Sequence, residues 1–386
     1  MKRVAFVTHC LALGGTEKHL GELILRSDDA RVQPSIVCLG PDVYTPVLRA
    51  GGRGNVAVHE VRPRTLWDYW RVFRWIRPHV VVFVNGKLGL FPWCAYAAAR
   101  LAGAERVVGI EHLQGERPPE PVMGRGIAAS VRRGIGWRAR YMLARRLTGY
   151  LSRPTICVSD AVRRTLIEDY GYPPARTLTI HNGIDVQYHQ RRSGAREAAR
   201  TWLGMRHDEP VLVCVARLAP LKRVDLLLEA LAIVRRSGVP CRSIIVGDGP
   251  LREALGVRAD ALGLSDRVRF VGHQDDVRPY LEAADAYVTS SEREGFGLAL
   301  AEAMAYELPC VATDIGGHDE LLADKEAGIL VPPRCSEELA RGILSVLDHP
   351  EHTRAMAKAA RRVIHERFNI DRMVAQIWNT IVGTRS

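Results

Sequence analysis

Short runs of β-branched residues alternate with longer amphipathic stretches along almost the whole chain. The segment 80–84, for example, is a continuous apolar run of strand length, and 92–102 after it has the spacing of a helix. Repetition of this pair predicts βα units, in which helices cover parallel strands. We therefore expect an α/β protein built on parallel sheets.

The expected strands form two groups of similar size. The first group is 4–8, 35–39, 56–61, 80–84, 107–110, 155–158 and 178–180, and the second is 211–216, 243–246, 268–271, 286–289, 310–313 and 329–331. The pattern pauses at 182–185, and an arginine-rich segment follows. Single cores stop growing at roughly 250–300 residues, and this chain has 386. We predict two Rossmann-like domains, 1–186 and 187–368.

Charge and composition narrow the class of partner. The net charge of +11 favours an anionic partner, either nucleotide phosphate, an acidic membrane surface or nucleic acid. No recognised nucleic-acid module is present, and no apolar run approaches the ~20 residues of a membrane span. The first apolar stretch breaks at His9 and reads as a strand rather than a signal peptide. The eight cysteines contain no C-x-x-C pair, which favours reduced thiols in a cytoplasmic protein.

The most specific segment is 294–302, Glu-Gly-Phe-Gly-Leu-Ala-Leu-Ala-Glu, directly after the strand expected at 286–289. A helix starting near Gly297 would offer free N–H groups to a diphosphate. Glu294 before the helix can bind sugar hydroxyls, and Glu302 inside it can bind a ribose diol. Two solvated glutamates are the alternative, and the glycines between them favour the binding site.

A second candidate is Arg217 and Lys222, which follow the strand at 211–216. Two cations there can neutralise a diphosphate and stabilise the charge that builds on it as it departs. A solvated basic turn is the alternative, because the chain has 54 basic residues.

The 294–302 segment resembles the Glu, seven residues, Glu signature of retaining nucleotide-sugar glycosyltransferases, in particular glycosyltransferase family 4. The resemblance covers nearly the whole chain. Further features in that family's order are Gly14-Gly15, His112, 182–185, Arg217 to Lys222 and 247–250. It implies a GT-B fold of two facing Rossmann-like domains, with the helix at 369–386 packing back on the first.

The resemblance also implies roles for particular residues. Glu294 would contact the donor sugar, Glu302 the ribose, and His112 the sugar from the other domain. Residues whose main chain or side chain would hold the donor are Gly14, Gly15, Gly247, Asp248, Val271, Phe296, Gly297, Leu298 and Ala299. With Arg217, Lys222, Glu294 and His112 as catalytic residues, transfer needs no metal and no cofactor besides the nucleotide-sugar, for which UDP is the favoured carrier.

The acceptor side is less specific. Asn85 and Lys87 follow the strand at 80–84, where binding crevices form, and are candidates for the acceptor site, with an ordinary loop as the alternative. Glu111, which precedes His112, is either a further acid on the acceptor side or a local substitution. The segment 115–153 holds nine arginines interleaved with apolar residues. It is a candidate for an anionic membrane surface or a lipid-phosphate acceptor, or else a solvated helix face.

These features together predict a hexosyltransferase that acts on a saccharide or lipid-linked acceptor, in cell-surface polysaccharide or glycolipid synthesis. We expect a cytoplasmic protein, peripheral to the inner face of the membrane. A transferase with a small-molecule acceptor and a nucleotide-sugar epimerase of the same fold remain alternatives. A dehydrogenase is disfavoured because the G-x-G-x-x-G fingerprint is missing.

Overall fold

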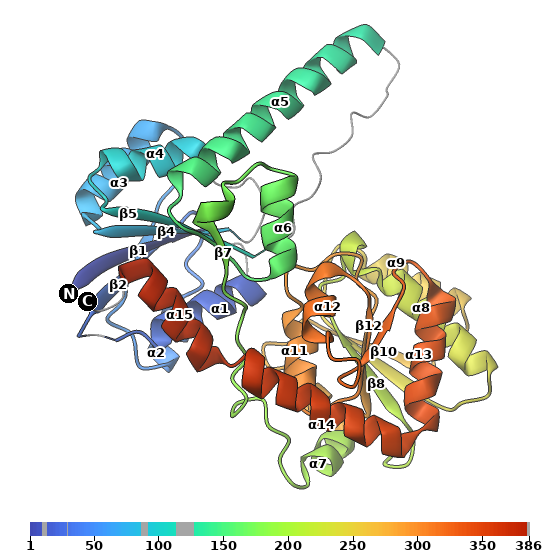
Figure 1. The fold of residues 1–386 in the computed structure, drawn as a ribbon. Helices are drawn as coiled ribbons and strands as arrows, with labels where there is room; N and C mark the ends of the chain where they lie inside the picture. The colour runs from blue at the N-terminus through green and yellow to red at the C-terminus, as the bar shows by residue number, and fades with distance from the viewer. Residues whose placement is uncertain (10–13, 29, 86–91, 113–126, 384–386) are drawn as a thin grey trace. The chain divides into compact units, whose positions relative to one another are not determined.

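The computed structural model describes residues 1–9, 14–28, 30–85, 92–112 and 127–383, with the backbone alone at 127–138 and 350. The chain forms two compact units (Figure 1). Unit 1 comprises Met1–Asn182 and Arg372–Ser386, and unit 2 comprises Gly183–Asp371. Each unit is a parallel sheet with helices on both faces.

Unit 1 contains a seven-stranded sheet of order β3-β2-β1-β4-β5-β6-β7. Its strands are β1 (Lys2–Thr8), β2 (Val32–Cys38), β3 (Ala57–Glu60), β4 (Val80–Asn85), β5 (Arg106–Glu111), β6 (Thr155–Cys157) and β7 (Thr177–Thr179). Its helices are α1 (Gly15–Leu25), α2 (Thr45–Ala50), α3 (Leu66–Ile76), α4 (Trp93–Leu101), α5 (Ile127–Leu151), α6 (Asp160–Glu168) and the 3-10 turn η1 (Pro174–Arg176), joined by α15 (Ile370–Val382) from the far end of the chain.

Unit 2 contains a six-stranded sheet of order β10-β9-β8-β11-β12-β13. Its strands are β8 (Val211–Val215), β9 (Arg242–Val246), β10 (Val268–Gly272), β11 (Ala286–Thr289), β12 (Cys310–Thr313) and β13 (Ile329–Val331). Its helices are α7 (Ala195–Leu203), η2 (Pro220–Lys222), α8 (Val224–Arg236), α9 (Arg252–Ala261), α10 (Arg278–Ala283), α11 (Leu298–Ala305), α12 (Gly316–Leu321), α13 (Ser336–Asp348) and α14 (Pro350–Arg367).

The predicted α/β class with two parallel sheets is confirmed, and every expected strand is present. The reason is burial on both faces, which makes a parallel strand a continuous apolar run. All six residues of β4 are buried, for instance. In both sheets the strand order reverses beside the first strand, which places a binding crevice at the carboxyl ends of β1 and β4 in unit 1 and of β8 and β11 in unit 2.

The two faces of the first sheet are covered by different parts of the chain. Helices α3 and α4 bury Tyr69, Phe73 and Tyr96 against Val81 and Phe83 of β4. On the other face, the ring of Trp378 in α15 meets Phe6 edge-on at 5.6 Å between centroids. The Trp378 indole Nε1 also donates to the Leu23 carbonyl at 3.0 Å, so α15 belongs to this core.

No helix within the described ranges is both long enough and apolar enough to cross a bilayer. The seven cysteines that the structure describes are free thiols, and five of them are buried.

Candidate active site

Two loops meet at the carboxyl ends of the neighbouring strands β8 and β11 in unit 2. The Glu292 backbone N–H donates to the Leu221 carbonyl at 2.8 Å. The Ser290 hydroxyl bonds the carbonyls of Lys222 and Arg223 at 3.1 and 2.8 Å. These bonds hold the Arg217–Lys222 loop against the loop that carries Glu294, so two segments predicted separately form one site.

Glu294 and Lys222 form an ion pair at this junction. The Ser291 hydroxyl donates to the same carboxylate oxygen, Oε1, at 2.8 Å. Burial by itself raises the pKa of Glu294, but the charge of Lys222 and the hydrogen bonds from Lys222 and Ser291 outweigh it and leave the pKa below its ordinary value. The carboxylate is therefore ionised and fixed in direction near neutral pH.

His318 of α12 also lies close to Glu294. It is buried, and its Nδ1 lies 3.0 Å from the Thr313 carbonyl. Since a carbonyl only accepts, Nδ1 carries the proton and Nε2 is left as an acceptor. Burial lowers the pKa of His318, although Glu294 opposes the shift, so the ring stays neutral near pH 7.

The backbone just before α11 has a conformation that favours glycine. Gly297 has φ +93°, and a Cβ there would lie 2.9 Å from Cδ2 of His318. A Cβ on Gly317 would meet the Phe296 carbonyl at 2.9 Å. Phe296 is itself buried against Phe368, with 5.4 Å between ring centroids. The first N–H groups of α11, from Leu298 and Ala299, have no partner inside the helix and are available to an anion.

The remaining unit 2 residues lie on adjoining segments. The Leu218 N–H donates to the Asp248 carbonyl at 2.9 Å, which ties the Arg217 loop to the 247–250 loop. Gly247 has φ +132°, and a Cβ there would fall 2.0 Å from the Ala216 carbonyl oxygen, so only glycine fits. Arg217 is exposed beside it.

Two other predicted donor residues are placed by their elements. Glu302 lies in α11, one turn after Leu298, and is half-buried. Val271 is half-buried near the carboxyl end of β10. The unit 2 residues predicted to bind the donor therefore all follow, or lie near, the carboxyl ends of the strands.

Unit 1 holds its predicted residues at the matching edge of its own sheet. Asn85 and Glu111 end the paired strands β4 and β5, and both are buried. The Asn85 Nδ2 donates to Glu111 Oε1 at 2.7 Å and lies 3.1 Å from the Tyr96 hydroxyl. The His112 N–H donates to the Asn85 carbonyl at 3.0 Å. Lys87 lies outside the described residues.

Arg145 of α5 is a partner that sequence reasoning missed. It is buried, and its guanidinium lies 3.7 Å from Glu111 Oε2 and over the rings of Tyr170 and Tyr172. Burial raises the pKa of Glu111, opposed by Arg145 and Asn85. The sequence carried no signal that singles out Arg145 among the nine arginines of 115–153.

His112 packs edge-on against His19 of α1, with 4.9 Å between ring centroids. Both are buried, and His112 Nε2 has no hydrogen-bond partner among the described residues. Burial and then the neighbouring His19 hold the pKa of His112 well below its ordinary value. A neutral imidazole with a free ring nitrogen can accept or donate one hydrogen bond to a ligand.

Gly14 and Gly15 lie exposed at the start of α1, after β1. The Gly14 N–H donates to the Glu17 carboxylate at 3.1 Å. They follow β1, beside which the strand order of the first sheet reverses, and glycines there let a ligand come close to the backbone.

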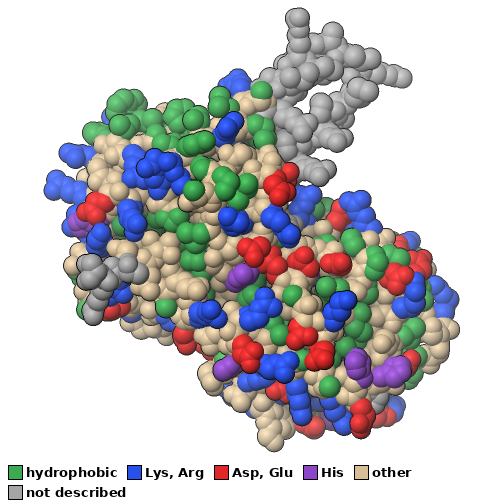
Figure 2. Space-filling model, viewed as in Figure 1, with side chains coloured by type: hydrophobic (Ala, Val, Ile, Leu, Met, Phe, Trp, Pro, Cys, Tyr) green, Lys and Arg blue, Asp and Glu red, His purple; other side chains and the backbone are tan. Residues whose placement is uncertain are grey.

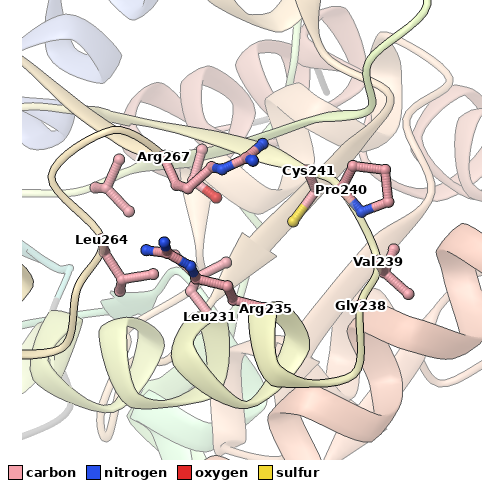
Figure 3. Close-up of a pocket in the computed structure, with 10 residues that line it drawn as sticks. Leu231, Arg235, Gly238, Val239, Pro240, Cys241, Leu264 and Arg267 are labelled. Carbon is pink, nitrogen blue, oxygen red and sulfur yellow. The ribbon is translucent and has the colours of Figure 1, made fainter.

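A cavity of about 240 Å³ lies elsewhere in unit 2, between the end of α8 and the start of β9 (Figure 3). Arg235 and Arg267 line it, and both pair with Asp266. It borders the amino ends of the strands, opposite the edge where such sheets bind ligands. We therefore place the candidate site at the carboxyl edges.

The two halves of the chain match two sequence families. Residues 13–188 match "Glycosyltransferase Family 4", and residues 195–363 match "Glycosyl transferases group 1". The chain is 30% identical over 198 residues to N-acetyl-alpha-D-glucosaminyl L-malate synthase of Bacillus anthracis, covering 51% of each chain. It is 31% identical over 259 residues to D-inositol 3-phosphate glycosyltransferase of Geodermatophilus obscurus, covering 62% of this chain and 55% of that one. The chain thus spans about half the length of the curated relatives it matches.

Solved structures match over the full length. Anabaena HepE in complex with UDP-glucose superposes with a TM-score of 0.82 at 21% identity, covering 100% of both chains. TarM superposes with a TM-score of 0.74 at 14% identity, covering 99% of both chains. At these identities the likeness shows the fold.

Proposed function

Since the chain belongs to glycosyltransferase family 4 and has the GT-B fold, we propose that it transfers a hexose-type sugar from a nucleotide diphosphate donor with retention of configuration. The observation that carries the proposal is the Lys222–Glu294 ion pair just before α11, close to Gly297, whose positive φ requires glycine. A cation, an oriented carboxylate and helix N–H groups then converge where a diphosphate and its sugar would lie.

Each group has a distinct task in the proposed donor complex. The N–H groups from Phe296 to Ala299 hold the phosphates, and Glu302 binds the ribose diol. Glu294 accepts hydrogen bonds from sugar hydroxyls, for which its lowered pKa keeps it ionised. UDP is the proposed carrier, supported by the UDP-glucose in the HepE structure.

The proposed chemistry is a substitution on one face of the sugar. The bond from the anomeric carbon to the β-phosphate oxygen breaks, and a bond to the acceptor oxygen forms on the same side. The acceptor hydroxyl proton passes to the departing phosphate, whose charge Arg217 and Lys222 stabilise. Fixed cations favour this transition state over the ground state because the charge on the phosphate grows as it leaves. His112, with its free Nε2, is proposed to contact the donor sugar.

For the acceptor we propose a saccharide or lipid-linked saccharide in cell-surface polysaccharide or glycolipid synthesis, contacted on the unit 1 side and through the basic segment 115–153. The second candidate is a small-molecule acceptor. It is favoured by the names of two relatives, which contain the words L-malate and inositol 3-phosphate. A nucleotide-sugar epimerase would act on the donor without any acceptor.

A donor panel tests the core of the proposal. Thermal unfolding is measured with UDP-, GDP- and ADP-sugars, and the true donor raises the melting temperature as its concentration passes its dissociation constant. Release of the nucleoside diphosphate is then followed with candidate acceptors. Stabilisation by no nucleotide-sugar, or isomerisation of the donor without transfer, would overturn the proposal.

A further inference from the structure

One side of helix α3 does not pack against the core. Tyr69 and Phe73 face the core, whereas Trp67, Arg71, Arg74 and Trp75 are exposed. These positions recur at four, seven and eight residues, so they share one outer face. Trp67 is 63% exposed and Trp75 is 69% exposed, which leaves two of the largest apolar side chains mostly outside the core.

The neighbouring helices continue this surface. Helices α3 and α4 pack side by side, and α4 packs against α5. Twelve large apolar side chains are exposed among those that the structure describes, and seven lie on these three helices. The seven are Trp67, Trp75, Trp93, Leu101, Leu143, Leu147 and Tyr150. We name these residues, with the exposed Arg71, Arg74, Arg140 and Arg146, the tryptophan–arginine face.

Helices α3, α4 and α5 are strongly basic. The sequences of α3, α4 and α5 contain nine arginines and a single acidic residue, Asp68. Its carboxylate is occupied by the helix start, where it accepts from the N–H groups of Arg64 and Thr65 at 3.0 and 2.9 Å. Figure 2 shows apolar and basic side chains interspersed over this part of unit 1.

We propose that the tryptophan–arginine face lies against an anionic lipid bilayer. Tryptophan suits the interface because its ring is apolar and its N–H is polar. Arginine keeps its charge at the headgroups while its stem covers apolar surface, and each basic residue near an anionic leaflet strengthens binding. A second copy of the chain fits less well, because a two-fold contact would bring this face onto itself with like charges opposed.

Membrane contact here has a consequence for the acceptor, one that rests on the proposed function. Trp67 and Trp93 lie in the first turns of α3 and α4, and helices of βα units start at the carboxyl edge of the sheet. That is the edge where β4 and β5 end at Asn85 and Glu111. A lipid-linked acceptor would therefore reach the edge of the sheet that carries the candidate residues.

The test is sedimentation of the full chain with vesicles of phosphatidylcholine alone, or of phosphatidylcholine mixed with phosphatidylglycerol, at low and moderate salt. We expect binding to the anionic vesicles that weakens as salt screens the charges. The double variant Arg71→Gln/Arg74→Gln should bind more weakly, by about fivefold for each arginine. Its matched control is Arg236→Gln/Arg354→Gln, at exposed positions of unit 2, which should bind like the wild type.

The tryptophans are tested separately. Trp67→Ala/Trp75→Ala should lose vesicle binding, and Trp202→Ala, which removes an equally exposed ring from unit 2, should not. Because the replaced side chains are exposed, unchanged thermal unfolding of all the variants is expected. No binding to anionic vesicles at low salt would overturn the proposal, as would equal losses in the controls, or a dimer without vesicle binding that the tryptophan variant dissociates. None of these measurements uses a nucleotide-sugar, so their failure is separate from failure of the proposed transfer.

Discussion

Two glutamates in one loop form ion pairs with different basic side chains. Glu294 pairs with Lys222, whereas Glu292 pairs with Arg223 and Arg334. The difference follows from the direction of each side chain and gives a matched pair for mutagenesis.

Glu294→Gln is predicted to lower kcat by at least ~100-fold, the order of loss when one fixed polar group is removed from a transition state. Glu292→Gln, two residues away, should retain most activity because Arg223 keeps Asp225 as a partner. Initial rates at saturating donor decide between them. Comparable rates for both variants would remove Glu294 from the proposed role.

The buried Glu111–Arg145 pair should matter for stability more than an exposed one. Arg145→Met would leave a buried carboxylate without its cation, and the free energy of unfolding should fall by about 3–5 kcal/mol. Arg146→Met changes the exposed neighbour on α5 and should cost little. Urea unfolding measures both, and equal midpoints would contradict the prediction.

Lowering the pH should reduce the free energy of unfolding of unit 1, because burial keeps its histidines neutral in the folded state. Burial lowers the pKa of His19 from 6.5 to about 4, so between these values the unfolded chain binds a proton that the folded chain does not. Stability is therefore present above pH 6.5 and lost as the pH falls towards 4, by up to about 3 kcal/mol for His19. His19→Gln should reduce this loss in urea titrations across that range, whereas His352→Gln, at an exposed position, should leave it unchanged.

At the scale of elements, the strands and the main helices could be predicted because buried parallel strands have a strong local pattern. The meeting of the Lys222 and Glu294 loops also followed from local information, since both follow strands at one sheet edge. The support from Ser291, His318 and Arg145 could not be predicted, because it depends on which side chains tertiary packing brings together. A serine, a histidine and one arginine among many carry no such signal in a single sequence.

Helix α15 provides a prediction of its own. Trp378→Ala would remove the ring that meets Phe6 and the hydrogen bond to the Leu23 carbonyl. Buried aromatic truncations typically cost about 3–5 kcal/mol, so the unfolding of unit 1 should shift to lower urea. Gln376→Ala lies on the exposed side of the same helix and serves as the control. A wild-type midpoint for Trp378→Ala would show that α15 adds little to this core.

At the scale of the molecule, the two units differ in how the chain builds them. Unit 2 is one continuous segment, whereas unit 1 needs residues from both ends of the described chain. Removing the residues after Asp371 should therefore expose unit 1 to limited proteolysis while unit 2 stays resistant. Cleavage spread equally over both units would contradict this division.

This discontinuity affects the order of events during translation. Phe6 is synthesised before unit 2, but Trp378 emerges only after all of unit 2 has been made, so the part of the first sheet that Trp378 covers stays exposed until then. Unit 2 can close as soon as its own residues have left the exit tunnel. Unit 1 is thus begun before unit 2 but completed after it, and the surface around Phe6 is accessible to solvent in the nascent chain until α15 arrives.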